Sequence, residues 1–193
     1  MSIVGVEGLH RPRTPSPRAG DLLIAAPSLL DPNFRRTVIY LLQHDDTDGS
    51  AGVVLNRPFL GLVDPAALPH WLTQTAALSQ GGPVATDSVI ALADVAVTPA
   101  HLRRAVGPGV CVVDLERVAE VDPFHPVRLF VGHSGWSAGQ LDDELGNADW
   151  HVVTGSPDDV LLTDPSQVWQ RVLSRQRLPI RMWTTLPDVV GAN

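Results

Sequence analysis

The amino-acid sequence predicts an α+β fold in which a mixed, largely antiparallel sheet is surrounded by short helices. Short apolar segments typical of strands follow one another directly in some places and alternate with helix-like segments in others. That order argues against a doubly wound parallel sheet, in which strands and helices alternate throughout. With 193 residues, of which 44% are hydrophobic, the chain has the size and composition of one globular domain.

The first half of the chain contains a predicted β-hairpin. Residues 21–26 (DLLIAA), 36–43 (RTVIYLLQ) and 51–56 (AGVVLN) are rich in apolar and β-branched side chains, which favours strands. Asp48-Gly49, between the last two, is a favoured pair for a tight turn in which both central residues have positive φ. Asp31-Pro32 predicts a further turn, because the proline moves the preceding residue out of the helical region.

Strands and short helices are both expected in the rest of the chain. A helix is predicted over residues 99–106, because Thr98 is a good N-cap, Pro99 suits the first helical position and Gly107 ends it. Further strands are predicted over 89–93, 110–115, 127–132 and 150–154. Further helices are predicted over 65–78, over 138–145 after a Ser137 cap, from Ser156 with two acids in its first turn, and over 166–175. The segment after Pro179 has few signals of order.

The domain organisation follows from composition at the two ends of the expected fold. Residues 1–19 contain several prolines and arginines and little apolar pattern, so we expect a flexible tail followed by one domain over residues 20–193. No apolar run approaches the roughly 18 residues of a membrane span, so no membrane association is expected. The single cysteine, Cys111, is expected as a buried thiol on a strand, which fits a reducing cytoplasm.

The charged residues exclude several functions and disfavour another. All 14 basic residues are arginine, so no lysine can form a Schiff base or complete a P-loop. Residues 1–19 contain three arginines and one glutamate, which leaves 11 arginines and 20 acids, a formal charge of −9, on the remaining chain. Since phosphate contacts supply most non-specific affinity for nucleic acid, an acidic body disfavours specific DNA binding.

The best polar cluster is expected at the open end of the predicted hairpin. Arg36 begins one hairpin strand, and Asn56 and Arg57 end the other, so an antiparallel pairing places them side by side. Two arginines and an amide can bind a carboxylate or a phosphate. The alternative is that these side chains cap loops or pair with Asp31 or another acid.

Two further features have a functional and a structural interpretation. Trp136, in a glycine-rich turn with Gln140 nearby, is a candidate for the floor of a binding pocket or a partner anchor, and core packing is the alternative. The seven histidines show no metal-binding spacing, so no metal site is predicted. His44 and the acids after it only distantly match a calcium loop, and we interpret them as a solvated hairpin turn.

Several ordered motifs resemble those of the YqgE/AlgH family. The family's Pro-x-Leu-x-Asp-Pro-x-Phe-x-Arg-Thr-Val pattern is matched by Pro27, Leu29, Asp31, Pro32, Phe34, Arg36, Thr37 and Val38. Its Gly-x-Val-x-Asn-Arg-Pro pattern is matched by Gly52, Val54, Asn56, Arg57 and Pro58. Gly81-Gly82-Pro83-Val84 and the run GHSGWSAGQLDDEL from Gly132 to Leu145 extend the resemblance over about residues 20–178. The resemblance implies a branched, partly barrel-like sheet, and it implies a bacterial transcriptional regulator.

From these observations we expect a cytoplasmic, non-catalytic binding or regulatory protein without a cofactor. Its expected partner is another protein or a small anionic ligand. One alternative is the DNA-associated transcriptional regulator that the resemblance implies. The other is a hydrolase using Ser134 and His133, since a strand runs into Gly-His-Ser-Gly there. The hydrolase is disfavoured because the elbow pattern requires glycine where Trp136 stands, and because adjacent residues on a strand point apart.

Overall fold

The computed structural model describes residues 16–61, 77–115, 117, 127–161 and 164–186. Most of the expected tail and of the helix expected over residues 65–78 lies outside these ranges. Ala77 and Leu78, at the end of that predicted helix, belong instead to a strand. No helix in the described part of the chain is long and apolar enough to cross a bilayer.

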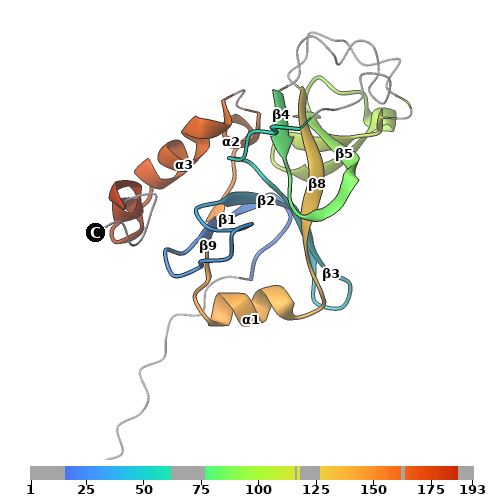
Figure 1. The fold of residues 1–193 in the computed structure, drawn as a ribbon. Helices are drawn as coiled ribbons and strands as arrows, with labels where there is room; N and C mark the ends of the chain where they lie inside the picture. The colour runs from blue at the N-terminus through green and yellow to red at the C-terminus, as the bar shows by residue number, and fades with distance from the viewer. Residues whose placement is uncertain (1–15, 62–76, 116, 118–126, 162–163, 187–193) are drawn as a thin grey trace, which may run out of the picture.

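The fold is α+β, as the sequence predicts, but strands dominate it (Figure 1). The described residues form one nine-stranded sheet in the order β6-β7-β5-β8-β3-β2-β1-β9, with β4 beside β8. All pairings are antiparallel except the one between β4 and β8. The strands are β1 (Asp21–Ala25), β2 (Val38–Asp45), β3 (Gly49–Val54), β4 (Ala77–Gln80), β5 (Val84–Asp94), β6 (Arg103–Gly107), β7 (Val110–Val113), β8 (Val127–Trp136) and β9 (Trp150–Thr154).

The sheet curls into a half-barrel because β8 joins two groups of strands. The first part of β8 pairs with β5 and β4, and its last residues, Ser134 to Trp136, pair with β3. Gly132 lies between these two parts with φ of 67°. A Cβ atom there would lie 2.7 Å from the Gly82 carbonyl oxygen, so the change of partner requires glycine. The branch implied by the family resemblance is therefore located at β8.

Both faces of the β1–β2 region are buried, against different helices. Alternate residues point to opposite faces of a strand, so Leu22 and Ile24 belong to one apolar cluster and Leu23 and Ala25 to another. The first cluster includes residues of α2 (Pro157–Val160) and α3 (Pro165–Ser174), and the second includes Leu141 of α1 (Gln140–Gly146). Figure 1 shows α3 and α1 on different sides of these strands. A third cluster contains Cys111, which is a free, buried thiol as expected.

Local signals at the two later helices match the predicted starts. Ser156 and Asp159 form a capping box at α2, with Pro157 at the first helical position. The Asp164 side chain accepts a hydrogen bond from the backbone N–H of Ser166 and so caps α3. The start of α1 differs from the prediction, because its N-cap is Gly139 with φ of 74° rather than Ser137.

Two predictions of local structure are wrong. The helix expected over residues 99–106 is a single 3₁₀ turn, η3 (Ala100–Leu102), followed by strand β6. The Thr98 hydroxyl donates to the Asp94 carbonyl oxygen instead of capping, and pairing with β7 overrides the local helical signals. The segment after Pro179 forms the 3₁₀ helix η5 (Ile180–Thr185), whose Ile180 and Trp183 pack against the first apolar cluster.

The junction between the expected tail and the domain is in contact with the fold. Pro17 is buried, and Ala19 packs against the first apolar cluster. The backbone N–H of Gly20 donates to the Leu41 carbonyl oxygen, and the Gly20 carbonyl accepts from Gly155. Residues 17–19, assigned to the tail from composition, therefore contact the domain.

Candidate functional site

A polar groove lies at the open end of the β2–β3 hairpin. It has a volume of about 420 Å³. It brings together the three residues that the sequence places at this end, and it adds side chains from the preceding turn and from α3. The lining residues are Arg35, Arg36, Asn56, Arg57, Ser166, Trp169 and Gln170.

Asn56 holds the two hairpin ends together. The backbone N–H of Val38 donates to Asn56 Oδ1 at 2.8 Å, and Asn56 Nδ2 donates to the Arg36 carbonyl oxygen at 2.7 Å. The amide therefore bonds to backbone on both of its sides. This geometry favours the structural interpretation for Asn56, which fixes the chain segments from which the arginines project.

Arg36 has a backbone conformation that non-glycine residues rarely adopt. Its φ is 57°, in the left-handed region, where an L-residue costs roughly 1–2 kcal/mol. The Asn56 amide bonds to the carbonyl of this same residue and so supports the conformation. The Arg36 guanidinium then lies 5.3 Å from the centre of the Trp169 ring and donates to the Leu186 carbonyl oxygen at 2.6 Å. A strained residue that points its side chain along a groove is a common feature of binding sites.

Arg57 and Arg35 place two positive charges close together. Arg57 Nη2 donates to the Arg35 carbonyl oxygen at 2.8 Å. Burial, and secondarily the charge of Arg35, lower the pKa of the Arg57 guanidinium. Within the described ranges neither arginine has a carboxylate partner. This end of the hairpin therefore favours an anion, because an added negative charge would compensate both arginines.

Arg35 and the three groove residues that come from α3 are not among the candidates that the sequence indicates. Arg35 is exposed and directly precedes Arg36, so the Arg-Arg pair after the Asp31 turn was an available signal. Trp169 lies on the buried face of α3, and its indole Nε1 is buried without a hydrogen-bond partner among the described residues. No pattern in the sequence connects α3 to the hairpin, because more than 100 residues separate them.

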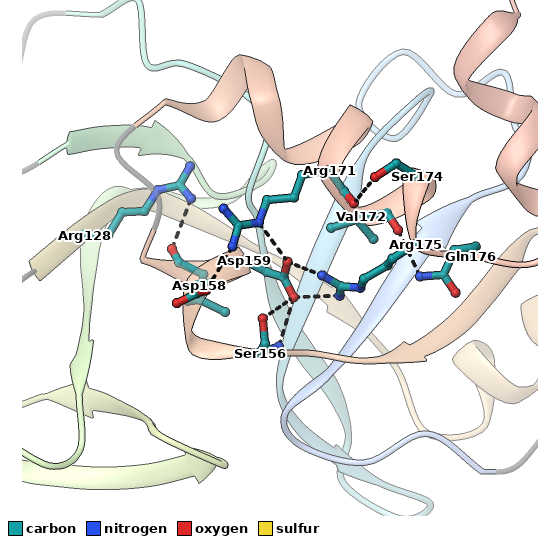
Figure 2. A network of polar contacts seen from close by, with 10 residues as sticks. Arg128, Ser156, Asp158, Asp159, Arg171, Val172, Ser174, Arg175 and Gln176 are labelled. Carbon is teal, nitrogen blue, oxygen red and sulfur yellow. Dashed lines mark hydrogen bonds and ion pairs between the residues drawn. The ribbon is translucent and has the colours of Figure 1, made fainter.

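The position of α3 is fixed by ion pairs and hydrogen bonds around the buried carboxylate of Asp159 (Figure 2). Asp159 is fully buried and accepts hydrogen bonds from both Nη atoms of Arg175 and from the backbone and hydroxyl of Ser156. Burial alone would raise the pKa of Asp159, but these hydrogen bonds outweigh it and the pKa lies below its ordinary value. Arg171 also lies 4.0 Å from this carboxylate. The network joins α2 to α3.

Arg128 of β8 connects α2 to the hairpin. It is 1% exposed, and its guanidinium donates to the carbonyl oxygens of Val160 and Leu55 and to the Ser79 hydroxyl. Burial lowers the pKa of Arg128 to about 10. In the described structure its partners are neutral oxygens rather than carboxylates. Because Leu55 directly precedes Asn56, Arg128 helps to fix the groove without lining it.

The structure places Trp136 and Gln140 away from this groove. The Trp136 ring packs against Phe34 and Trp150, with ring centres 6.3 and 5.9 Å away. Its Nε1 donates to Glu144 at 2.8 Å, and Gln140 Nε2 donates to the same carboxylate at 2.9 Å. These contacts brace α1 against the sheet. They favour core packing, the structural alternative, for Trp136, whereas Gln140 is exposed beside it.

Ser134, the nucleophile of the hydrolase alternative, is fully buried in β8. Its hydroxyl donates to the Gly81 carbonyl oxygen at 3.3 Å. A catalytic serine must present its hydroxyl to substrate. The geometry therefore favours a structural role for Ser134 at the junction of β8 and the Gly81-Gly82 turn.

Comparison with known proteins connects this fold to one family. The AlgH-like family model matches residues 22–181. A UPF0301 protein of Rhodococcus erythropolis is 43% identical over 190 residues, covering 93% of this chain and 92% of the relative. A UPF0301 protein of Mycobacterium avium is 42% identical over 187 residues, covering 91% of each chain.

Two solved structures have the same fold. A crystal structure of a protein from Corynebacterium diphtheriae has a TM-score of 0.79 and 30% identity, covering 90% of this chain and 94% of that one. The solution structure of the AlgH protein from Pseudomonas aeruginosa has a TM-score of 0.67 and 28% identity, covering 91% and 98%. With a family match that spans most of its length and relatives above 40% identity, this chain belongs to the AlgH-like family.

Proposed function

We propose that this protein is a non-catalytic, cytoplasmic binding protein whose groove takes a small anionic ligand with a carboxylate or phosphate group. The observation that supports this most is the pair Arg35 and Arg57, two adjacent cations without carboxylate partners in the described chain. They lie in a domain whose formal charge beyond the tail is −9, where acids outnumber arginines. Regulation, in this proposal, follows from occupancy of the groove.

The groove has the chemistry that such a ligand requires. Guanidinium groups offer several N–H donors in a plane, which matches the oxygens of a carboxylate or phosphate. The side chain of Trp169 and the guanidinium of Arg36 form one wall, and Arg57 and Arg35 form another part of the lining. A volume of about 420 Å³ lies within the range of small-molecule sites. This size suits an organic phosphate or a di- or tricarboxylate.

The test is a thermal-shift titration with inorganic phosphate and with citrate, with glycerol as a neutral probe. A ligand that binds only the native state raises apparent stability by about 2.7 kcal/mol at 100 times its Kd. We expect phosphate or citrate to raise the Tm of the wild type, and Arg57→Gln and Arg35→Gln each to remove most of that rise. Arg177→Gln is the matched control, because it removes an exposed arginine that does not line the groove.

The proposal fails if neither anion raises the Tm, or if Arg57→Gln and Arg35→Gln respond as the control does. Duplex DNA is the further arm, because the family resemblance implies a regulator of transcription. We expect weak, salt-sensitive DNA binding without sequence preference, since the acidic body repels phosphates. Sub-micromolar, sequence-specific binding at physiological salt would instead support the DNA-associated regulator.

A further inference from the structure

The turn end of the β2–β3 hairpin brings three potential metal ligands together. His44 lies in β2, Asp46 in the turn and Asp142 in α1, and one ligand atom of each lies within 4.8 Å of the others. We propose that these three side chains bind a divalent first-row transition metal ion such as Zn²⁺. The proposed site is separate from the arginine groove, at the opposite end of the same hairpin. The sequence interpretation of this segment as a simple solvated turn did not include Asp142.

His44 is the residue that distinguishes this group from an ordinary cluster of surface acids. Its side chain is only 8% exposed. Its Nδ1 lies 2.7 Å from the Ser50 hydroxyl, and its Nε2 is buried without a hydrogen-bond partner among the described residues. A buried nitrogen without a partner requires an explanation, because nearly all buried polar atoms are satisfied. When Nδ1 donates to Ser50, Nε2 presents a lone pair, which is the arrangement of a metal-binding histidine.

The two carboxylates are available to complete the site. Both Asp46 and Asp142 are exposed, and neither accepts a hydrogen bond from any described residue. The adjacent Asp45 is not available in the same way, since one of its oxygens accepts from the backbone and hydroxyl of Thr47 and from the backbone of Asp48. These bonds fix the turn, so Asp46 is held beside His44, with Oδ1 3.7 Å from Nε2.

Contacts of the hairpin with the end of β8 bring Asp142 to the same point. Ser50 pairs with Trp136, so the start of β3 lies beside the residues that lead into α1. Gly49 packs so closely on this segment that a Cβ atom would lie 2.3 Å from the Trp136 carbonyl oxygen. Asp142 then projects from the first turn of α1 toward the hairpin turn, within reach of His44 and Asp46.

The donor set indicates the class of metal. Zinc binds imidazole nitrogen and carboxylate oxygen at about 2.0–2.2 Å, and two such ligands of a tetrahedral ion lie about 3.4 Å apart. The 3.7 Å between His44 Nε2 and Asp46 Oδ1 is close to that separation. An imidazole ligand favours Zn²⁺ or its transition-metal neighbours over Mg²⁺ and Ca²⁺, which prefer oxygen ligands alone. Three protein ligands leave a coordination position for water.

The experiment is a Zn²⁺ titration of the full chain against a chromogenic chelator. We expect the wild type to bind Zn²⁺, and Asp142→Asn and His44→Asn each to weaken that binding by about tenfold or more. His44→Asn removes Nε2 but keeps an amide near the position of Nδ1, where it can still bond to Ser50. Asp143→Asn is the matched control, with the same loss of charge at the next exposed position of α1, and we expect its affinity to stay within about twofold of wild type.

Histidine ring NMR signals provide a second readout that does not depend on the variants. Zn²⁺ should shift the ring resonances of His44 in the wild type, and a large excess of Mg²⁺ should not. Binding no tighter than on the order of 1 mM, Zn²⁺ affinity that survives both Asp142→Asn and His44→Asn, or unshifted His44 signals would each overturn the proposal. In those cases the contact between His44 and Asp46 has no metal-binding role. Circular dichroism of each variant verifies that it is folded.

Discussion

The two ends of the β2–β3 hairpin differ in charge and in how the fold holds them. At the open end, Arg35, Arg36 and Arg57 line a groove and are organised by Asn56. At the turn end, His44 and Asp46 lie beside Asp142 of α1. The open end is held by a side-chain amide bonded to backbone, whereas the turn end is held by the Asp45 carboxylate and by the close contact of Gly49 with β8.

One short hairpin supports two separate groups of polar side chains, one at each end. Each end obtains some groups from the hairpin and the rest from a helix distant in sequence, α3 at one end and α1 at the other. A strand of eight residues separates the ends, so opposite charges do not neutralise one another. A formal net charge of −7 therefore conceals a local concentration of positive charge.

Gly49→Ala should have the largest effect, because it disrupts the turn end. The φ of 87° is unfavourable for alanine by about 1–2 kcal/mol, and the added Cβ would lie 2.3 Å from the Trp136 carbonyl oxygen. We expect the free energy of unfolding to fall by about 3 kcal/mol, strain and overpacking together. Urea unfolding measures this.

Gly146→Ala is the control for that substitution. A Cβ at Gly146, at the end of α1, meets no atom within 4 Å, so we expect a change smaller than about 1 kcal/mol. Equal stability of the two variants would show that the close contact between the turn and β8 is unimportant. If Gly49→Ala remains folded, it should weaken Zn²⁺ binding and leave the response to phosphate or citrate intact.

Asn56→Ala should disrupt the open end of the hairpin, with a smaller loss of stability than Gly49→Ala. It removes two hydrogen bonds and leaves the Val38 N–H and the Arg36 carbonyl without their partner, which predicts a loss of about 2 kcal/mol. For a chain of this size the Tm should fall by roughly 4–8 °C. The rise in Tm on addition of phosphate or citrate should decrease, while Zn²⁺ binding should remain as in the wild type.

Asn56→Asp tests the two hydrogen bonds of that amide separately. The carboxylate still accepts from Val38 but cannot donate to the Arg36 carbonyl oxygen. Stability between that of the wild type and that of Asn56→Ala is the expected result. Wild-type stability of Asn56→Ala itself would contradict the role assigned to this residue.

Asp45→Asn should have the smallest effect on stability. The effect should be visible as a change in how the free energy of unfolding depends on pH. Hydrogen bonds from Thr47, and then from Asp48, lower the pKa of Asp45 from 3.8 to about 2. A lowered pKa in the folded state stabilises the protein above pH 4, and that contribution is lost as the pH falls through about 2. The variant should therefore lose less stability than the wild type between pH 4 and pH 2, measured by thermal unfolding.

Asp48→Asn is the control in the same turn, because its side chain accepts no hydrogen bond from the described residues and the three bonds to Asp45 remain. We expect it to follow the wild type through this range. If the stability of Asp45→Asn depends on pH as that of the wild type does, these hydrogen bonds do not stabilise the turn.

Local signals predicted most elements but failed where pairing with a distant strand decided the outcome. The hairpin strands, the helix start at Ser156 and the buried Cys111 depend on neighbouring residues, and each is confirmed. The tight turn predicted at Asp48-Gly49 is confirmed in part. Asp45 pairs with Gly49 around a three-residue turn, and of the two predicted residues only Gly49 has positive φ. Residues 103–107 form a strand because β7 provides its backbone partners.

In the candidate sites, too, local signals predicted some contacts and distant packing decided the others. Arg36, Asn56 and Arg57 were predicted to lie together because antiparallel pairing alone brings hairpin ends into contact. The sequence offers Trp136 and Gln140 as separate binding candidates, but the structure places both at Glu144, in contacts that brace α1. Whether a polar residue faces a groove or a helix depends on packing that periodicity does not encode.

The sequence by itself determined the alternation of strands and short helices, the hairpin and its positive open end. These features depend on side-chain chemistry and on φ preferences within a few residues. Only the tertiary structure decided that α3 completes the arginine groove and that Asp142 meets His44, 98 positions earlier in the chain. Contacts over such separations arise because both faces of one sheet are buried. Burial depends on apolar surface, so the apolar pattern of the sequence does not predict which polar groups are brought together.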